Sequence, residues 1–441
     1  MCGTTLVTGR LMRHSSPRRA LPQARFAPGA LWLDTPVTRD AFGFDVQARL
    51  AGTSGRAGVI RTPHGEIATP AFTPVGTKAT VKAVLPEAMR DLGAQVILAN
   101  AYHLYLQPGP GLVDRAGGVA AFMGWDGPTI TDSGGFQVLS LGVGFKKVLA
   151  MDVSAMQSDD VIAHGKDRLA HVDDDGVTFK SHLDGSMHRF TPEVSMQVQH
   201  QLGADIMFAF DECTTLLNTR EYQELSVSRT QRWAERCVAE HLRLTDAREG
   251  KPYQALFAVV QGAQYEDLRR KSARELASLD VDGFGIGGAL EKDQLGTIVR
   301  WVTDELPEGK PRHLLGIGDP VDFFGAVEAG ADTFDCVAPS RNARNGTVFH
   351  PDGRFHITNG RYRDDFAPID DECDCYTCSH HTRAYVHHLF KAKEMLASTL
   401  ATIHNERYIV RLVDAIREAI LDGTYADFRD ETLSRLGRRG A

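Results

Sequence analysis

Cysteine is scarce in this chain, which has seven among its 441 residues. So few cysteines, and an odd number of them, exclude a small secreted fold held together by disulfides. Long apolar runs are missing as well, since no uninterrupted stretch approaches the roughly 20 residues that span a bilayer. We therefore expect a cytoplasmic protein without membrane association, in which the cysteines that stand alone in the sequence are reduced: Cys2, Cys213, Cys237 and Cys336.

The chain also lacks an excess of basic residues. Its formal net charge of −8 excludes a generally basic nucleic-acid binder, because attraction to phosphate needs surplus lysine and arginine. Contact with RNA then requires a local basic patch. The segments "SRNARNG" (340–346) and "NGRYR" (359–363) supply one, with four arginines close in sequence: Arg341, Arg344, Arg361 and Arg363. The alternative for this stretch is an ordinary solvated loop.

Short apolar runs are what the chain does contain. Helix-length patterns lie between several of them, for example at 219–242 and 264–279. Apolar strands that alternate with helices indicate a parallel sheet covered on both faces. With at least seven such strands, we predict an α/β fold, a (β/α)8 TIM barrel, over an open doubly wound sheet. The predicted strands lie in "AQVILAN", "GPTITDSGGF", "ADIMFAFDE", "YQALFAVVQG", "DGFGIGG", "RHLLGIG" and "ADTFDCVAP".

Polar residues follow these predicted strands directly. In a parallel barrel such positions open onto the C-terminal mouth, where barrels of this kind build active sites. Any single one is alternatively a helix cap or a turn residue, but six in register favour a shared site. They are Asp132 with Ser133, Asp211 with Glu212, Gln261 with Gly262, Gly287 with Gly288, Gly316, and Asp335.

Histidine is absent from these strand ends in the "HxH" pattern that metalloenzyme barrels commonly use. Three aspartates without a histidine pair favour chemistry at a sugar carbon, in which one carboxylate attacks the anomeric carbon and another moves protons. Hydrolysis at a magnesium or zinc ion held by the aspartates is the competing interpretation.

Three of the cysteines are clustered in "DECDCYTC" (371–378). Cys373, Cys375 and Cys378 have the spacing of a zinc knuckle, which needs one more ligand. Five histidines follow, and we favour His404 because its long helical pattern can pack across the knuckle. A site with four protein ligands has no open position, so we predict one structural zinc ion per chain, with three buried thiols as the alternative. The other histidines are His380, His381, His387 and His388.

Together these segments resemble the bacterial type of queuine tRNA-ribosyltransferase, a family also called tRNA-guanine transglycosylase. The resemblance covers roughly residues 42 to 425 and implies a zinc-bearing variant of the eight-stranded barrel. It rests on "TDSGGFQ" (131–137), "FDECT" (210–214), "VVQG" (259–262), "GIGGALEK" (285–292), "TFDCVAPSRNARNG" (333–346), "CDCYTC" (373–378) and "TIHNERY" (402–408).

The resemblance implies roles for individual residues. Asp335 matches the nucleophile, which attacks the anomeric carbon of the wobble nucleotide in tRNA, expels guanine and leaves a covalent ribosyl-enzyme. Asp132 matches the residue that recognises the base and takes part in proton transfer, whereas Asp332 is expected to be structural. The implied base-binding set is Ser133, Phe136, Asp211, Cys213, Gln261, Gly288, Ala289 and Leu315.

Within that set, Asp211 is expected to accept from the amino edge of the base, and Gln261 and the amide of Gly288 to hold its exocyclic oxygen. Phe136 and Leu315 are expected to sandwich the ring, with ordinary core packing as the alternative for each. For Cys213 we expect packing in the pocket wall, because no neighbour lowers its pKa.

On the RNA side, the resemblance implies that Ser340, Arg341 and Arg344 contact the anticodon loop and that the protein is a homodimer. The implied reaction exchanges guanine in GUN anticodons for a 7-deazaguanine base, most simply the aminomethyl precursor of queuine. Queuine, the nitrile base or a DNA substrate are alternatives, as is a non-catalytic tRNA-binding subunit. Three desolvated carboxylates argue against a pure binder.

Two features depart from the family pattern. The chain has "GGALEKD" where the family usually has close to "GGLSVGE", so the glutamate that shapes the aminomethyl end of the pocket is out of place. A segment around 142–170 is longer than expected and is either a lid, an added tRNA contact or a tolerated surface insertion.

The sequence also suggests domain limits. Residues 1–41 are expected to be a disordered extension. The alternatives are a transit peptide or a start codon that has been assigned too far upstream. Residues 42–365 are assigned to the catalytic barrel. A zinc-binding subdomain with C-terminal helices packed on the barrel follows at 366–425, and a tail at 426–441.

Overall fold

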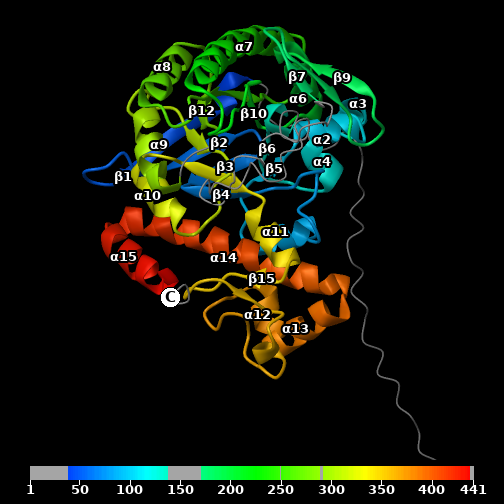
Figure 1. Ribbon diagram of the computed structural model, residues 1–441, viewed down its shortest axis with the longest axis vertical. Helices are drawn as coiled ribbons and strands as arrows, with labels where there is room; N and C mark the ends of the chain where they lie inside the picture. The colour runs from blue at the N-terminus through cyan, green and yellow to red at the C-terminus, as the bar shows by residue number, and fades with distance from the viewer. Residues whose placement is uncertain (1–37, 138–169, 249, 289–291, 438–441) are drawn as a thin grey trace, which may run out of the picture.

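A computed structural model describes residues 38–137, 170–248, 250–288 and 292–437 of the chain. Residues 1–37 of the predicted extension and residues 142–169 of the predicted insertion lie outside the described residues. The described part consists of a barrel and a smaller C-terminal lobe, joined by one long helix (Figure 1).

The barrel is an eight-stranded parallel sheet that is nearly closed. Its strand order is β4-β14-β13-β12-β11-β10-β6-β5, and its two ends meet where Val75, next to β4, bridges to Leu98 in β5. This confirms the predicted fold class. The strands are β4 (Ala71–Pro74), β5 (Ile97–Ala99), β6 (Thr129–Thr131), β10 (Ile206–Phe208), β11 (Ala255–Val260), β12 (Gly283–Ile286), β13 (Arg312–Leu314) and β14 (Thr333–Cys336).

Strand β4 is the barrel strand that the sequence pattern did not predict. It is buried at all four positions and pairs in parallel with β14. It follows Pro70 and ends at Pro74, and proline normally argues against a central strand because it cannot donate to the ladder. Here both prolines stand at the limits of a very short strand, so little of the ladder is lost.

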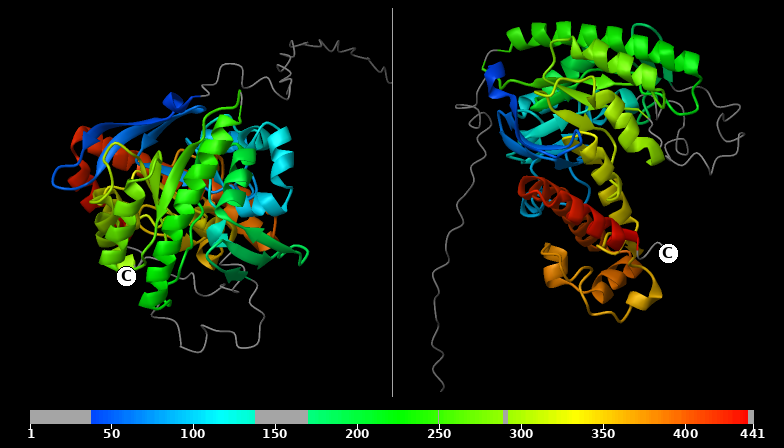
Figure 2. Two further views of the ribbon diagram at one scale, coloured as in Figure 1. Left: turned by 90° about the horizontal axis from the view of Figure 1, so that it is seen from above. Right: turned by 90° about the vertical axis from the view of Figure 1, so that its left-hand side faces the viewer.

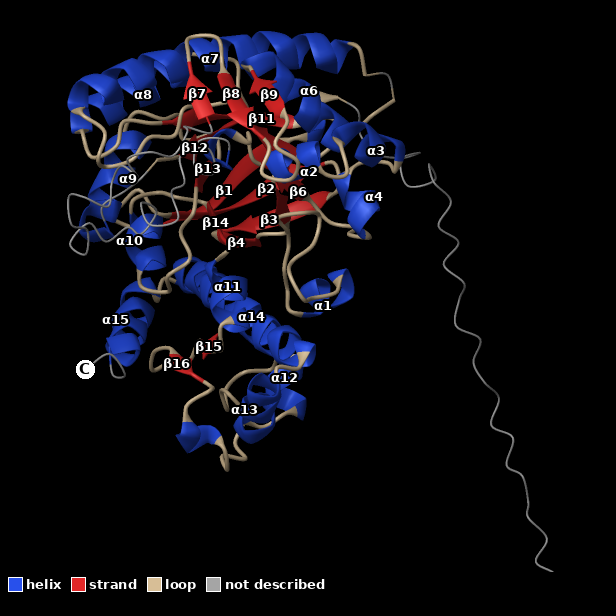
Figure 3. Ribbon diagram, turned by 45° about the vertical axis from the view of Figure 1, so that its right-hand side comes forward, coloured by secondary structure: helices blue, strands red, loops and turns tan. Residues whose placement is uncertain are grey.

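Helices cover the outside of the barrel (Figure 3). The two longest predicted patterns correspond to α7 and α8, and α7 buries Trp233 and Cys237 against the barrel. The covering helices are α1 (Pro86–Asp91), α2 (Ala101–Leu106), α3 (Pro110–Arg115), α4 (Val119–Met123), α6 (Pro192–Leu202), α7 (Arg220–Asp246), α8 (Glu266–Ala277), α9 (Leu295–Thr303) and α10 (Asp322–Glu328).

Two small antiparallel sheets, which the sequence analysis did not anticipate, accompany the barrel. One consists of β1 (Gly43–Arg49), β2 (Arg56–Thr62) and β3 (Gly65–Thr69). Arg56 of this sheet forms a buried ion pair with Asp332 at 2.7 Å, just before β14, which accounts for Asp332 as a structural residue. The other sheet consists of β7 (Ala170–Val172), β8 (Val177–Lys180) and β9 (Met187–Phe190).

The C-terminal lobe begins after β14 and packs at one end of α14, as the right-hand view of Figure 2 shows. Helix α14 then returns along the barrel and packs against β4. The elements are α11 (Ala338–Arg344), β15 (Thr347–Val348), β16 (Phe355–His356), a short 3-10 turn at Gly360–Tyr362, α12 (Tyr376–His380), α13 (Arg383–Ala392), α14 (Met395–Asp422) and α15 (Tyr425–Leu436). Two further 3-10 turns, Arg39–Ala41 and Lys292–Gln294, lie outside this lobe.

Helix α15 occupies most of the predicted C-terminal tail. Its first residue, Tyr425, is buried, and its hydroxyl donates to the carbonyl oxygen of Phe324 on α10 at 3.0 Å. The described part of this segment is thus attached to the barrel. In the described ranges, no helix combines the length and the apolar character needed to cross a membrane.

Candidate active site and metal site

The polar residues predicted at the strand ends meet at the C-terminal mouth of the barrel. Asp132 follows β6, Asp211 follows β10, Gln261 follows β11, and Asp335 lies within β14. Because the strands run in parallel, their carboxyl ends open onto the same face. Hydrogen bonds and charge interactions link these side chains across the mouth.

Asp132 is a buried carboxylate that three donors hold in place. Its Oδ1 accepts from the backbone N–H of Ala101 at 2.7 Å, and its Oδ2 accepts from Asn100 at 2.5 Å and from Gln137 at 2.7 Å. Burial raises its pKa to about 6; the hydrogen bonds oppose this, and the charge of Asp335 adds to it. A carboxyl that titrates near neutrality can both give and take a proton.

Asp211 sits deeper and joins the neighbouring strand ends. It accepts from the hydroxyl of Ser133 at 2.9 Å and from the Nε2 of Gln261 at 2.7 Å. A Cβ at Gly135 would lie 2.6 Å from the carbonyl oxygen of Asp211, so only glycine allows this approach. Burial raises the pKa of Asp211 to about 6.

The buried charge of Asp211 gives a testable dependence of stability on pH. The pKa is about 6 in the folded protein against 3.8 for a free aspartate, so the folded state binds more protons, and the free energy of unfolding falls as pH rises through this range. Above pH 6 the cost reaches about 3 kcal/mol. Asp211→Asn should therefore raise the melting temperature at pH 8 relative to wild type and change it little at pH 4.

Calorimetry at both pH values measures this difference. Asp91→Asn is the matched control, because Asp91 is exposed and its substitution makes the same chemical change without removing a buried carboxylate. If Asp211→Asn changed the melting temperature equally at pH 4 and pH 8, the buried charge of Asp211 would not be the cause of the change.

Gln261, which donates to Asp211, lies next to the two glycines that follow β12, Gly287 and Gly288. The Oε1 of Gln261 has no hydrogen-bond partner among the described residues, and a Cβ at Gly288 would lie 2.6 Å from it. Gly288 has a φ of +88°, a conformation that favours glycine. The backbone at Gly288 thus approaches a free acceptor, which leaves polar groups available to a ligand.

Arg269 was not predicted from the sequence. It lies on α8, is completely buried, and its Nη1 donates to the carbonyl oxygens of Gly287 at 2.7 Å and Val260 at 3.0 Å. It thereby ties the ends of β11 and β12 together beneath the pocket. An arginine in the first turns of a polar helix carries no sequence signal for this role, because such residues are usually solvated.

Cys213, Leu315 and Phe136, which were predicted to bind the base, differ in burial. Burial raises the pKa of the Cys213 thiol to about 12, so it stays protonated, which favours packing in the wall. Leu315 is half-buried and packs against the barrel core. Phe136 is 40% exposed, so ordinary core packing is the wrong interpretation for that residue. Ala289 lies outside the described residues.

Asp335 is held by two groups from the neighbouring strand. Its Oδ1 lies 3.1 Å from the Nε2 of His313 and accepts from the backbone N–H of Gly316 at 3.0 Å. The side chain is 14% exposed, and its charge reaches Asp132. His313 also escaped prediction, because it sits inside an apolar strand pattern and meets Asp335 only in space.

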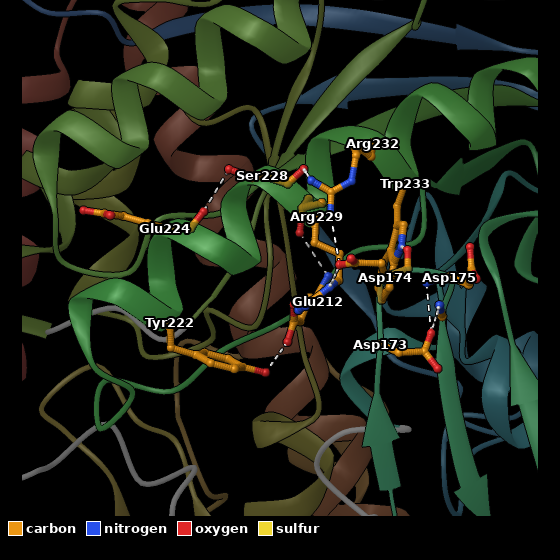
Figure 4. Close-up of polar contacts among 12 residues, drawn as sticks. Asp173, Asp174, Asp175, Glu212, Tyr222, Glu224, Ser228, Arg229, Arg232 and Trp233 are labelled. Atoms are coloured by element: carbon orange, nitrogen blue, oxygen red, sulfur yellow. Dashed lines mark hydrogen bonds and ion pairs between the residues drawn. The ribbon is translucent and has the colours of Figure 1, made fainter.

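Glu212, the residue after Asp211, is linked to the sheet of β7, β8 and β9 through Arg229 (Figure 4). Glu212 is buried and accepts from the hydroxyl of Tyr222 and from Arg229, both on α7. Arg229 also donates to Asp174, which lies in the turn between β7 and β8. The turn between β7 and β8 is therefore linked through Arg229 to Glu212, the neighbour of Asp211.

The predicted RNA-contacting residues lie on α11, directly after β14. Arg341 is exposed and Arg344 is half-buried, whereas Ser340 is buried and its hydroxyl donates to Val337 at 3.3 Å. Burial and then the charges of Arg344 and Arg341 lower the pKa of Lys82. The positive patch thus includes a lysine from a distant segment, which proximity in sequence could not reveal.

The metal cluster is formed by Cys373, Cys375, Cys378 and His404, whose ligand atoms all lie within 4.8 Å of one another. The Nδ1 of His404 lies 3.3 Å from the Sγ of Cys378 and 3.7 Å from that of Cys375. Tetrahedral zinc with ordinary bond lengths would hold sulfur and nitrogen about 3.6 Å apart. The Nε2 of His404 lies 2.8 Å from the carbonyl oxygen of Phe349, which leaves Nδ1 free to bind a metal.

These residues therefore fit a tetrahedral metal ion with three thiolates and one imidazole. The ligands are buried or half-buried and no fifth donor is part of the group. Such a set favours a structural ion over a catalytic one, because it leaves no position for substrate.

A sequence model of the family described as "Queuine tRNA-ribosyltransferase" matches residues 51–438. The chain belongs to the queuine tRNA-ribosyltransferase family. Membership confirms the resemblance and the prediction of a pentosyltransferase enzyme. It also fits the barrel, the carboxylates at its mouth and the cysteine cluster.

Three relatives that carry the family's name show how much of the chain is shared. The protein of Fusobacterium nucleatum is 45% identical over 385 residues, covering 86% of this chain and 95% of the relative. The protein of Caldanaerobacter subterraneus is 44% identical over 398 residues, which cover 90% of this chain and 98% of the relative. That of Herpetosiphon aurantiacus is 47% identical over 383 residues, with 86% and 89% covered.

Proposed function

We propose that this enzyme exchanges the wobble guanine of tRNAs with a GUN anticodon for a 7-deazaguanine base, through a covalent ribosyl-enzyme. The observation that supports it most is the presence of Asp132, Asp211 and Asp335 at one barrel mouth in a member of this transglycosylase family. The aminomethyl precursor of queuine is the proposed incoming base.

Base recognition would use the deep part of the pocket. A guanine-like ring has an amino group and a ring N–H on one edge, which match the two acceptor oxygens of Asp211. Its exocyclic oxygen needs donors, which the amide of Gln261 and the backbone N–H of Gly288 would supply. Phe136, whose side chain is partly exposed, is available to stack on the ring.

The chemistry would proceed in two displacements. A carboxylate oxygen of Asp335 attacks the anomeric carbon, the bond from that carbon to guanine breaks, and the departing base takes up a proton. The new base then loses a proton, attacks the same carbon and releases Asp335. Two inversions retain configuration, and Asp132, with its pKa near 6, is suited to move the protons.

Binding of the anticodon loop would use the positive patch around α11. Removal of one phosphate contact should weaken tRNA binding about tenfold and reduce its dependence on salt by about one counterion. Arg344→Ala is thus expected to raise the Kd for tRNA without changing the affinity for free base. Fluorescence anisotropy at several salt concentrations measures both, and Arg300→Ala, an exposed arginine on α9, is the control.

The metal cluster would hold one zinc ion. Zinc would supply no chemistry at the reacting carbon; it would fix the fold of the lobe. The thiolates of Cys373, Cys375 and Cys378 and the Nδ1 of His404 would bind it. We also propose a homodimer, as the resemblance implies, which light scattering would test.

Displacement of radiolabelled guanine from tRNA tests the proposed reaction. The aminomethyl base, queuine and the nitrile base are supplied as acceptors in parallel, because residues 289–291 of "GGALEKD" leave the acceptor open. Release driven by one acceptor would support the reaction and identify the base. Failure with all three, on folded metal-loaded protein, would favour a non-catalytic tRNA-binding subunit or a different nucleic acid.

A further inference from the structure

His313 lies inside the barrel, where its side chain has no exposed surface. It belongs to β13, and its ring packs beside Phe208 of β10, with ring centroids 5.3 Å apart. A polar ring in such a place costs free energy unless its nitrogens are hydrogen-bonded. Both nitrogens have partners.

The two nitrogens of His313 connect neighbouring positions of β14. Nδ1 lies 2.8 Å from the hydroxyl of Thr333, and Nε2 lies 3.1 Å from the Oδ1 of Asp335. An ionised carboxylate can only accept, so Nε2 carries the proton. In a neutral ring the Thr333 hydroxyl then donates to Nδ1, which fixes the tautomer and the ring orientation.

The contacts of Asp335 are unequal on its two oxygens. Oδ1 receives both donors, the Nε2–H of His313 and the backbone N–H of Gly316 at 3.0 Å. No described residue forms a hydrogen bond with Oδ2. Since the side chain is partly exposed at the barrel mouth, Oδ2 is the oxygen that a substrate can reach.

We infer that His313 is a positioning residue that fixes Asp335 so that Oδ2 forms the bond to the anomeric carbon. This rests on the proposed role of Asp335 as nucleophile. In the ribosyl-enzyme, Oδ2 becomes the ester oxygen and Oδ1 the carbonyl oxygen, which keeps its two donors. When the incoming base attacks, the bond from Oδ2 to the sugar breaks and negative charge returns to the carboxylate, where His313 and Gly316 stabilise it.

Loss of the His313 donor should therefore slow the chemistry more than it weakens binding. His313→Phe keeps a ring and removes the N–H, and we expect kcat to fall about 100-fold, as for other lost donors to a developing anion. The KM for tRNA should change by less than about twofold, because His313 is fully buried and offers no surface for a nucleotide to contact.

His313→Gln is the conservative variant. Its amide N–H can replace Nε2–H, so it should recover at least tenfold of the activity lost in His313→Phe. The amount of covalent adduct formed with tRNA in the absence of acceptor base, measured on denaturing gels, should follow the same order. Melting temperature and metal content show that each variant is folded.

Two results would overturn the inference. One is wild-type kcat in His313→Phe, and the other is an equal loss in the Phe and Gln variants, which would mean that only ring packing matters. Should His313→Phe fail to fold, Thr333→Val, which removes the partner that orients the ring, should lower kcat several-fold, and no decrease there would equally refute it. Wild-type protein with neither adduct nor exchange would instead refute the proposed function.

Discussion

Asp335→Ala should lose guanine exchange by about 10⁴-fold or more while the protein stays folded. A residue that forms the covalent bond cannot be replaced by the rest of the site, which supplies only binding and orientation. The substitution removes a partly exposed side chain near the end of β14, but it also takes away the partner of the buried His313 Nε2, so folding is measured beside activity. Steady-state exchange and adduct formation with tRNA measure the loss.

The controls separate chemistry from folding. Metal content and tRNA affinity of Asp335→Ala should equal those of wild type, because neither depends on the carboxylate. Cys336→Ser changes the adjacent half-buried residue and should retain exchange within a few-fold. Full turnover in Asp335→Ala would remove the nucleophile assignment and leave Asp132 or Asp211 as the candidate.

Cys375→Ala should remove the metal and unfold the C-terminal lobe. Cys375 is one of the four proposed ligands, and its Sγ also accepts from the backbone N–H of Cys378 at 3.4 Å at the start of α12. Structural zinc contributes on the order of 10 kcal/mol to small zinc domains, which is comparable with the stability of a whole domain. We expect less than a tenth of the wild-type metal and a loss of helix on circular dichroism.

Loss of the metal should also lower the rate of guanine exchange, because residues next to the metal cluster hold α11 in place. Asn405, next to the ligand His404, donates to the carbonyl oxygen of Pro339 at 3.1 Å and accepts from the N–H of Phe349 at 3.0 Å. These bonds hold the segment that follows Asp335. Atomic absorption, circular dichroism and exchange are measured together, with Cys336→Ser as the thiol control, and a full complement of metal in Cys375→Ala would refute the ligand set.

The sequence predicted those parts of the fold that a single local pattern of residues identifies. Fully apolar runs indicated seven barrel strands, and cysteine spacing indicated the metal ligands, because both patterns are local. Strand β4 was not predicted, because Pro70 and Pro74 normally argue against a strand. It is stabilised by pairing with β14, which lies far from it in the sequence. The antiparallel sheets were not predicted because strands such as β1 and β9 are largely half-buried or exposed and lack a continuous apolar run.

The candidate site was predictable to a similar degree. Aspartates at strand ends could be grouped because a parallel barrel brings all strand ends to one face. His313, Arg269 and Asn100 could not, since each acts on a residue from another element, and a single polar residue in an apolar run or a single arginine on a helix has several ordinary explanations. Their roles depend on distances that only the assembled barrel defines.

The pairing of β4 with β14 has a consequence for how the chain is made. β4 begins at Ala71, and its partner ends at Cys336, so a nascent chain carries an unpaired barrel edge through most of its synthesis. The helix that covers β4, α14, emerges later still. Closure of the barrel between β4 and β14 is therefore among the last events of biosynthesis, and a ribosome that stops early releases a chain whose apolar first strand lacks its β14 partner.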